Sequence, residues 1–336
     1  MSQRIGVLGA GSWGTALANL LAKKGHAVTV WSFEGPVADA INERHENERY
    51  LPGLKLNERV TATPAVARAV SGADVVVSVT PAQHVRRVLQ DAASVLKPDV
   101  LIVSASKGIE TSTLKTMAEV IEDVLPGAAG AHATFLSGPS FALEVAREQP
   151  TAVAMASHHH ESAERAQALF QAPYFRVYTN PDVIGVELGG SLKNVIAIAA
   201  GMASGLGLGY NALAALMTRG LAEIARLGVA LGANPLTFSG LAGMGDLILT
   251  CTGELSRNRS VGVSLGQGKS IEEILGAMYM VAEGVETTRA AHALARRTGI
   301  EMPIVAQVHA VLFEGQTARA ALENLMLREP KPETWK

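Results

Sequence analysis

A lysine in the second half of the chain stands at the start of a long apolar helical stretch. The segment Glu187–Gly201 reads ELGGSLKNVIAIAAG, and its only cation is Lys193. In a helix, the neighbours of this lysine at i+3, i+4 and i+7 are all apolar, so its stem faces inward. Burial destabilises an ammonium and lowers its pKa toward neutrality, which lets a lysine exchange a proton with a substrate. The structural alternative is a lysine whose head reaches water or the carboxylate of Glu187.

Two polar stretches interrupt the apolar pattern further along the chain. Leu241–Gly253 (LAGMGDLILTCTG) places Asp246 after two glycines, where its carboxylate either caps a helix or pairs with a catalytic group. The run Ser256–Arg259 (SRNR) brings a hydroxyl, guanidinium groups and an amide to a predicted helix start. That combination suits a phosphate group, and it also suits a simple polar helix entrance.

Two other features that look like chemical sites are interpreted as structural. Cys251 has no histidine near it in the sequence, so a small buried thiol is a better interpretation than a nucleophile. Three consecutive side chains, His158–His160, cannot all point at one ion on a regular element, and no carboxylate or cysteine spacing supports them. We therefore expect a solvated loop at the histidines and no metal site.

A glycine-rich turn near the N-terminus has the order of elements that a dinucleotide site requires. The turn Gly9–Gly14 (GAGSWG) joins a short apolar strand, Arg4–Leu8, to the helical stretch Thr15–Lys24, and a second strand, Ala27–Trp31, follows. The first glycine permits the tight bend, the second lets the backbone approach a pyrophosphate, and the third lets the helix pack on the strand. The N-terminus of that helix offers N–H donors to the anion.

The end of the second strand normally reports on the ribose of the nucleotide, through an acid that accepts from its 2′-hydroxyl. Here the strand ends in Trp31-Ser32-Phe33-Glu34, with neither a clear acid at the expected place nor an arginine for a 2′-phosphate. Glu34 could instead cap the next helix, which Pro36 would open. The choice between NAD and NADP therefore stays open.

The rest of the first half continues the pattern of a doubly wound sheet. Continuous apolar runs, typical of parallel strands buried on both faces, alternate with helical segments. Ligands of such sheets lie beyond the carboxyl ends of the strands, where this chain has Lys107 (in SASKGIE) and Ser137–Ser140 (SGPS). A solvated surface lysine is the alternative for Lys107. The predicted strands are Asp74–Thr80, Val100–Ser104, Ala133–Leu136, Thr151–Ala156 and Tyr174–Tyr178, with a helix over Glu161–Gln171.

After Pro181 the strand-like runs stop and nearly every segment has helical periodicity. The predicted fold class is α/β, with a Rossmann-type doubly wound sheet in residues 1–181 followed by an all-α domain in residues 182–336. We expect Glu223 and Arg226 on the exposed side of their helix. The predicted helices are Gly185–Met202, Ala212–Leu231, Pro235–Ser239, Arg257–Gly266, Ile271–Ala277, Glu286–Thr298, Pro303–Phe313 and Ala318–Met326.

Composition limits the functions that this chain can have. Its 336 residues are 48% hydrophobic and carry a net charge of −2, so no overall basic field exists to hold nucleic acid. The single cysteine fits a reducing compartment, and we expect a cytoplasmic protein. No charged residue lies between Lys193 and Arg219, but Gly201, Gly205, Gly207 and Gly209 break this window. Two buried helices around a glycine-rich turn are therefore expected, and no membrane insertion.

Several motifs together resemble one enzyme family over nearly the whole chain. They are IGVLGAGSWGTALA, SASKGIE, SGPSFA, GGSLKNVIAIAAG, TRGLAEIARLG, LAGMGDLILTCT, SRNR and VAEGVETT. With these motifs the chain resembles the bacterial-type glycerol-3-phosphate dehydrogenases. The resemblance implies interconversion of dihydroxyacetone phosphate and sn-glycerol 3-phosphate with NAD(P)H, which feeds glycerophospholipid synthesis.

The resemblance also implies roles for individual residues. Lys193 corresponds to the general acid/base, Lys107 to a second cation in the substrate pocket, and Asp246 to the carboxylate that orients them. The substrate-binding positions are Lys107, Gly138, Ser140, Lys193, Asp246, Ser256, Arg257 and Asn258. The cofactor-binding positions are Gly9, Gly11, Ser12, Trp13, Gly14, Phe33, Tyr50, Lys107, Ala142, Arg257, Val281 and Glu283.

One position departs from the family pattern. Where many members carry a histidine or arginine beside the adenosine ribose, this chain has Phe33, which cannot pair with a 2′-phosphate. The resemblance therefore leaves the preference between NAD and NADP undecided.

Two other functions compete with this assignment. A related β-hydroxyacid-type dehydrogenase would act on a carboxylate, and an arginine serves either anion. A dinucleotide-sensing protein would bind the cofactor without catalysis and would not need Lys193. The very apolar helical half favours a homodimer whichever function holds.

Overall fold

An eight-stranded sheet forms the first half of the molecule. The computed structural model describes residues 2–125, 127–278, 282–330 and 332–333. The strands lie in the order β10-β9-β8-β7-β6-β1-β2-β5, and the six from β8 to β5 are parallel to one another. Their bounds are β1 Arg4–Leu8, β2 Ala27–Trp31, β5 Val60–Thr63, β6 Val75–Ser78, β7 Leu101–Ser104, β8 Thr134–Ser137, β9 Thr151–Ala156 and β10 Phe175–Asn180.

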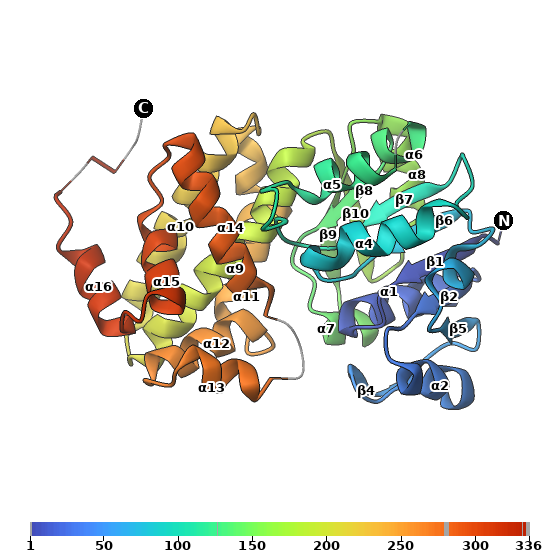
Figure 1. The fold of residues 1–336 in the computed structure, drawn as a ribbon, viewed down its shortest axis with the longest axis horizontal. Coiled ribbons are helices and arrows are strands. Elements are labelled where there is room, and N and C mark those ends of the chain that lie inside the picture. Colours follow the sequence, from blue (N-terminus) through green and yellow to red (C-terminus); the bar gives the residue numbers. More distant parts are fainter. Residues whose placement is uncertain (1, 126, 279–281, 331, 334–336) are drawn as a thin grey trace.

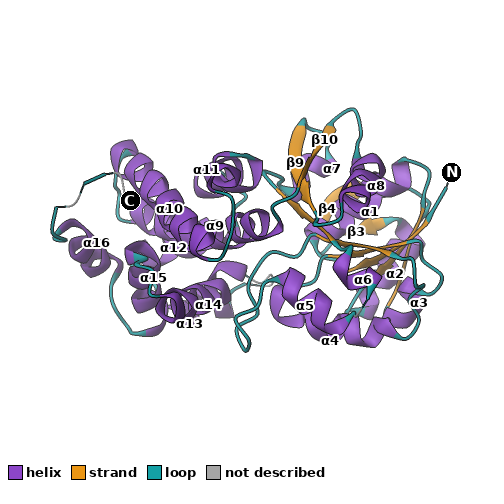
Figure 2. Ribbon diagram, turned by 90° about the horizontal axis from the view of Figure 1, so that it is seen from above, coloured by secondary structure: helices purple, strands orange, loops and turns teal. Residues whose placement is uncertain are grey.

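Helices cover both faces of this sheet, which is why the central strands are apolar on both sides (Figure 2). Every residue of β6, β7 and β8 is buried. One face packs against α1 (Ser12–Lys23), α2 (Gly35–Arg44) and α8 (His160–Phe170). The other face packs against α3 (Val66–Val70), α4 (Ala82–Ala93) and α5 (Met117–Val124). Two short helices, α6 (Ala128–Ala131) and α7 (Ala142–Ala146), complete this half.

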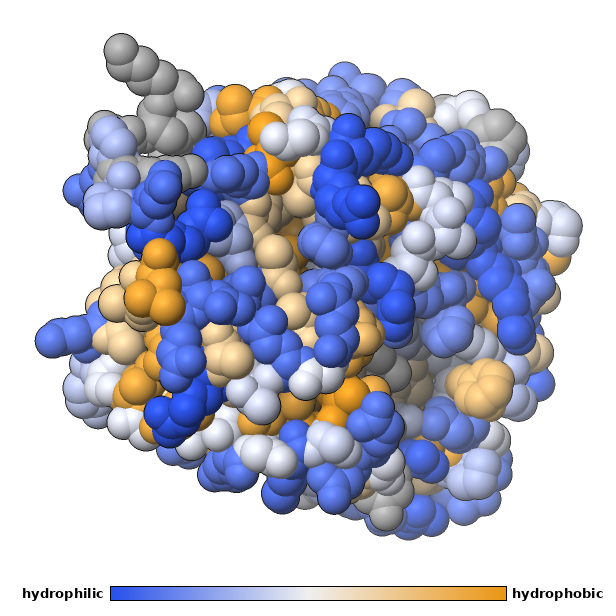
Figure 3. Space-filling model, turned by 60° about the vertical axis from the view of Figure 1, so that its left-hand side comes forward, coloured by the Kyte–Doolittle hydropathy of each residue, from blue (hydrophilic) through white to orange (hydrophobic). Residues whose placement is uncertain are grey.

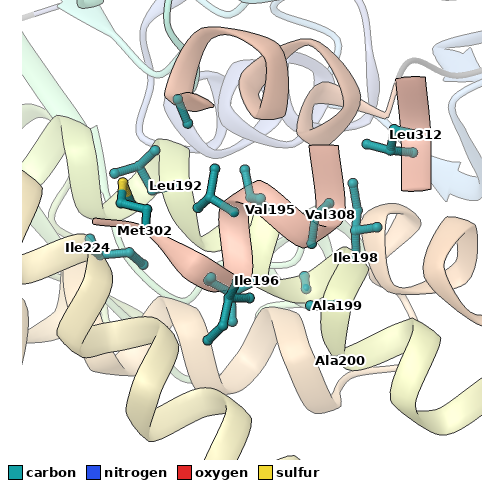
Figure 4. Packing of buried hydrophobic residues seen from close by; sticks show 14 of the residues in the cluster. Leu192, Val195, Ile196, Ile198, Ala199, Ala200, Ile224, Met302, Val308 and Leu312 are labelled. Atoms are coloured by element: carbon teal, nitrogen blue, oxygen red, sulfur yellow. The ribbon is translucent and has the colours of Figure 1, made fainter. Parts of the chain in front are cut away.

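The second half is helical and is built around α9 (Val183–Gly205), which the other helices surround (Figure 1). This helix is long and apolar enough to cross a membrane, but 94% of its apolar window is buried inside the protein. Figure 4 shows Leu192 and Val195 of α9 among side chains such as Ile224, Met302 and Val308. The surrounding helices are α10 (Tyr210–Ala230), α11 (Asp246–Thr252), α12 (Arg257–Gly266), α13 (Ile271–Gly276), α14 (Glu283–Thr298), α15 (Pro303–Phe313) and α16 (Ala318–Met326).

Two glycine pairs let α9 and α12 approach backbone to backbone. A Cβ atom on Gly201 or Gly205 of α9 would overlap the carbonyl oxygen of Arg259 or Val263 on α12. A Cβ atom on Gly262 would likewise overlap the carbonyl oxygen of Ile198 on α9. The expected break in the apolar window is present between α9 and α10, but Gly201 and Gly205 serve helix packing and do not belong to the turn.

The structure adds features of the sheet half that the sequence did not predict. The strand β9 runs antiparallel to β8, and β10 is parallel to β9, so these two strands run against the rest of the sheet. Apolar runs predict a strand but carry no information on its direction. A small hairpin of β3 (Glu46–Asn47) and β4 (Leu51–Lys55) and the edge strand β5 were not predicted, because their alternation is short and polar.

The prediction that Glu223 lies on the exposed side of its helix is wrong, and Arg226 is only partly exposed. Glu223 is 3% exposed, and its carboxylate accepts the backbone N–H groups of Ile304 and Val305 at the start of α15. Burial raises the pKa of Glu223 to about 7, while those backbone donors act in the opposite direction. The carboxylate caps a helix that lies far away in the sequence, which helical periodicity could not reveal.

The close approach of α9 and α12 gives a stability test. We expect Gly262→Ala to lower the free energy of unfolding by about 2–3 kcal/mol, because the new methyl group overlaps the α9 backbone and the helices must separate. Urea denaturation followed by circular dichroism measures the change. Gly276→Ala is the matched control, since its Cβ would meet no heavy atom within 4 Å. Equal stability of the two variants would contradict this packing argument.

Candidate active site

A buried carboxylate joins the two lysines that the sequence analysis selected. The Nζ atom of Lys107 lies 2.8 Å from Oδ2 of Asp246, and the Nζ atom of Lys193 donates a short hydrogen bond to Oδ1 of the same side chain. Asp246 is 1% exposed and Lys193 is 6% exposed. Lys107 lies in the loop after β7, Lys193 on α9 and Asp246 on α11. Together they form one charged group, which we call the lysine–aspartate cluster.

Local structure explains how these three side chains meet. Asp246 is the first residue of α11 and follows a turn of π-helix, Leu241–Gly245, so it does not occupy the capping position that one interpretation gave it. The hydroxyl of Thr250 donates to the Asp246 carbonyl oxygen at 2.6 Å and fixes this turn. On α9, a Cβ atom at Gly190 would overlap the Ser137 hydroxyl and lie 3.8 Å from Cδ of Lys107. The absence of a side chain there lets α9 approach the end of the sheet.

The electrostatics of the cluster favour one labile proton. Burial lowers the pKa of Lys193 to about 7, the positive charge of Lys107 adds to this effect, and Asp246 opposes it. Burial alone would raise the pKa of Asp246, but the two lysines outweigh burial and lower it. The carboxylate therefore stays ionised at neutral pH while Lys193 titrates there.

A long cleft of about 940 Å³ connects the glycine turn of the first half with the start of α9 and α12. It reaches both lysines of the cluster. Most of the residues predicted for cofactor and substrate line it, which places them in one continuous space: Gly9, Gly11, Ser12, Trp13, Gly14, Phe33, Tyr50, Lys107, Ser140, Ala142, Lys193, Ser256, Arg257, Asn258 and Glu283.

The glycine turn fits a dinucleotide. Gly9 has a φ of 129°, which a side chain would strain, and a Cβ atom on Gly14 would overlap the Gly9 carbonyl oxygen. A Cβ atom on Gly11 would meet nothing within 4 Å, so open space lies where the pyrophosphate would sit on the N-terminus of α1. Among the described residues, the indole N–H of Trp13 is buried without a hydrogen-bond partner, which suits a donor to a bound group.

At the ribose end of the cleft, Glu34 does not cap α2 with its side chain, contrary to one expectation. It accepts instead from the hydroxyl of Tyr50 at 2.5 Å, and the Tyr50 carbonyl oxygen accepts from Ser12 at 2.5 Å. Phe33 is 75% exposed at the mouth of the cleft. A carboxylate therefore lies at this end of the cleft, three residues after β2, and it is fixed to the glycine turn through Tyr50.

The other end of the cleft carries the groups predicted for a phosphate. Ser256 is the N-cap of α12 and accepts from the N–H of Arg259, and Arg257 is the first residue of that helix, with an exposed side chain. Oδ1 of Asn258 accepts from the N–H of Gly284 at 2.9 Å, which joins α12 to α14. An arginine, a helix N-terminus and an amide therefore converge at this end.

Among the described residues predicted for the site, Gly138 and Asp246 are the two that do not line the cleft. Gly138 does not line the cleft, but its carbonyl oxygen accepts from Nζ of Lys107 at 3.4 Å and from the hydroxyl of Ser140 at 2.9 Å. Glu283 lines the cleft as the first residue of α14. Val281 lies outside the described residues.

The structure also describes Cys251 and the histidine run, which the sequence analysis interpreted as structural features. Cys251 is fully buried, and burial raises the pKa of its thiol to about 12, as expected for an unreactive cysteine. The histidine run is only partly a solvated loop, because His159 caps α8 and its ring stacks on His132 at 3.8 Å between ring centroids. Within the described parts of the chain, no group of three His, Cys, Asp or Glu side chains could hold a metal ion.

Sequence analysis missed other side chains that line the cleft. Asn194 follows Lys193 directly and is the last polar residue before the apolar run, a signal that was available. Thr250 stands one helical turn after Asp246, and its hydroxyl lies 3.5 Å from Oδ1 of that carboxylate. His84 and Arg87 come from α4, where nothing in the local pattern distinguishes them from solvated residues.

Comparisons with known proteins identify the family of this chain. The chain matches family models described as the N-terminus of NAD-dependent glycerol-3-phosphate dehydrogenase over residues 4–163 and as its C-terminus over residues 182–323. A glycerol-3-phosphate dehydrogenase (NAD(P)+) of Geobacter metallireducens is 57% identical over 333 residues, 99% of each chain. The structure of glycerol-3-phosphate dehydrogenase from Coxiella burnetii is 39% identical, with a TM-score of 0.93 over 97% of this chain and 99% of that one. The enzyme from Saccharomyces cerevisiae is 29% identical, with a TM-score of 0.81 over 96% of this chain and 99% of its own. This chain belongs to the NAD-dependent glycerol-3-phosphate dehydrogenase family.

Proposed function

We propose that the lysine–aspartate cluster catalyses the interconversion of dihydroxyacetone phosphate and sn-glycerol 3-phosphate. The observation that carries this assignment is that both lysines of the cluster line the cleft, which also contains the dinucleotide turn and Arg257. An electrophilic carbonyl needs a proton donor at its oxygen and an anchor for its phosphate. The cleft supplies a donor in Lys193 and an anchor in Arg257.

The phosphate anchor sets the orientation of the substrate. Arg257 offers two N–H donors to the phosphate, and the N-terminus of α12 adds backbone dipoles. With the phosphate held there, the carbonyl group points toward Lys193 and Lys107, which line the same cleft. The short distance that this leaves between reactants lowers the entropic part of the barrier.

Proton transfer falls to Lys193. A nicotinamide cofactor held by the glycine turn Gly9–Gly14 in the cleft would supply the hydride for the carbonyl carbon. As negative charge develops on the carbonyl oxygen, Lys193 donates its proton to it, and Lys107 stabilises the charge. Asp246 holds both amines in place through its two oxygens. Once Lys193 is neutral, Asp246 keeps its ion pair with Lys107.

Other enzyme and non-enzyme functions make different use of these residues. A dehydrogenase of β-hydroxyacids would place a carboxylate on Arg257, and its activity would not need a phosphate on the substrate. A dinucleotide sensor would not need the cluster at all. The match with glycerol-3-phosphate dehydrogenases over the whole chain favours the phosphate substrate.

The proposal also covers the domain boundary, the location of the protein and its oligomeric state. We place the domain boundary between residues 181 and 182, since β10 ends at Asn180 and α9 begins at Val183. We also propose a cytoplasmic homodimer that supplies glycerophospholipid synthesis, without binding nucleic acid or inserting into a membrane. Apolar side chains such as Tyr210 and Leu236, 90% and 76% exposed on the helical half, support an interface between copies. Figure 3 shows apolar side chains interspersed among hydrophilic ones on the side of the helical half.

Replacement of the proton donor tests the assignment. In an assay of NADH absorbance with dihydroxyacetone phosphate, we expect Lys193→Ala to lower kcat about 1,000-fold, while the Kd for NADH changes less than about twofold. Lys269→Ala, an exposed lysine outside the cleft, is the control and should behave like wild type. If wild type binds NADH but never oxidises it with this substrate, the sensor function gains support. Turnover of β-ketoacids without a phosphate would favour the alternative enzyme.

The pKa of Lys193 predicts the pH dependence of the reaction. Reduction needs the protonated lysine, so kcat/KM for dihydroxyacetone phosphate should fall as pH rises above about 7, and the reverse oxidation should fall below it. In Asp246→Asn the amine loses its opposite charge, so its midpoint should move to lower pH. A profile from about pH 5 to 9 measures both midpoints. An Asp246→Asn midpoint at or above that of wild type would show that another group titrates.

The position of Glu34 predicts a preference for NADH. Its carboxylate lines the ribose end of the cleft and would repel a 2′-phosphate, although Arg49 lies over the Tyr50 ring at 5.5 Å. We expect kcat/KM to be at least about tenfold higher with NADH, and Glu34→Gln to reduce this ratio by about tenfold. Glu48→Gln, an exposed carboxylate outside the cleft, is the control. Equal use of NADH and NADPH by wild type would contradict a role of Glu34 in cofactor preference.

A further inference from the structure

A second, much smaller cavity also touches Lys107. Its volume is about 10 Å³, about the space of one water molecule. Its polar lining comes from the ends of β7 and β8, from the Lys107 loop and from α9, and comprises Ser104, Ser106, Lys107, Ser137, Glu187 and Ser191. Lys107 is therefore shared between this cavity and the cleft of the active site.

Two buried hydroxyl groups in this lining point to a bound molecule. Ser104 and Ser137 are 1% and 3% exposed, and within the described chain neither hydroxyl has a hydrogen-bond partner. Buried polar groups are normally satisfied by protein or by ordered water. A polar space of this size with at least two unpaired hydroxyls has the volume and the partners that one water molecule needs.

Glu187 lines the cavity and is itself partly exposed. It lies on α9 and accepts the N–H of Ala118 at 3.1 Å, at the start of α5. The protein packed around Glu187 raises the pKa of its carboxyl group to about 8. The hydroxyl of Thr116 and the N–H of Ala118 oppose that rise, whereas the negative charge of Glu119 on α5 adds to it. Lys107 faces it across the cavity.

The proposed reaction creates a demand for such a group. Each reduction removes a proton from Lys193, which is 6% exposed and lies in a cleft that cofactor and substrate fill. The amines of Lys193 and Lys107 donate to the two oxygens of the same Asp246 carboxylate, so they are neighbours. The neighbouring lysine is therefore the nearest source of a replacement proton.

We propose that Glu187 and one water molecule in this cavity pass protons from solvent to Lys107 and from there to Lys193. The inference rests on the proposed function, since only a reaction that consumes a proton needs the route. Neutral Lys193 takes a proton from the Lys107 ammonium, and the resulting amine takes one from the water. The water takes one from the Glu187 carboxyl group, whose carboxylate is then protonated from solvent. One proton enters for each proton delivered, and in the oxidation direction the same steps run backwards.

The test separates delivery of the proton from the chemical step. Glu187→Gln keeps an oxygen to accept from Ala118 but cannot release a proton. With enzyme in excess over NADH, we expect a single turnover of dihydroxyacetone phosphate within about twofold of wild type, because Lys193 starts protonated. Steady-state kcat should fall by about tenfold, its solvent deuterium isotope effect should increase, and its decline with pH should begin earlier.

Controls distinguish this route from a structural role and from failure of the proposed function. Glu122→Gln changes an exposed carboxylate on α5 that does not line the cavity, and it should leave all these values unchanged. If Glu187→Gln fails to fold, the double change Ser104→Ala and Ser137→Ala removes two water partners and should give the same separation of rates. Unchanged kcat and isotope effect in a folded variant, or a cavity that is dry in a high-resolution crystal structure, would overturn the route. Wild type that never reduces this substrate would instead refute the function itself.

Discussion

The structure depends on one buried carboxylate that is shared between two lysines. Two ammonium groups brought together in a buried site repel each other, and each costs free energy to remove from water. Asp246 offsets both costs at once, since each of its oxygens accepts from one lysine. The single negative charge of Asp246 cannot neutralise two ammonium groups. Burial lowers the pKa of Lys193, so this lysine readily loses its proton and the excess positive charge is removed. The imbalance of charge is thus what makes the cluster reactive.

Close backbone packing brings the members of the cluster into reach. Residues 107 and 246 lie 139 positions apart, on opposite halves of the molecule. They meet because α9 approaches the end of the sheet at Gly190 and approaches the π-helical turn before α11 at Gly189, whose Cβ would contact the backbone of Ala242. The glycines of this helix therefore help to position the cluster, because they leave space for other parts of the backbone to approach.

The sequence predicted local features well and long-range ones poorly. The glycine turn, the inward-facing Lys193 and the bounds of α12, α15 and α16 follow from patterns within a few residues. No pattern of that kind could place Lys107 on Asp246, since spacing does not record which loops meet. The partner of Glu223 is the start of α15, about 80 residues later, so the helix pattern around it suggested exposure. The roles of the site residues came from resemblance to a family and not from spacing, and they stay predictions.

The helix α9 belongs to both halves of the molecule. Only Pro181 and Asp182 separate it from the last strand, and Val183 and Val186 pack with the hydrophobic core of the sheet, whereas later residues form the core of the helical half. Asp182 also caps α9 and accepts the N–H of Asn234. A chimaera that exchanges the two halves between relatives at the domain boundary would therefore cut through a shared core. A chimaera that folds would have to include the first turn of α9 and the Asn234 loop together with the sheet. We therefore expect the sequences of the two halves to have evolved together.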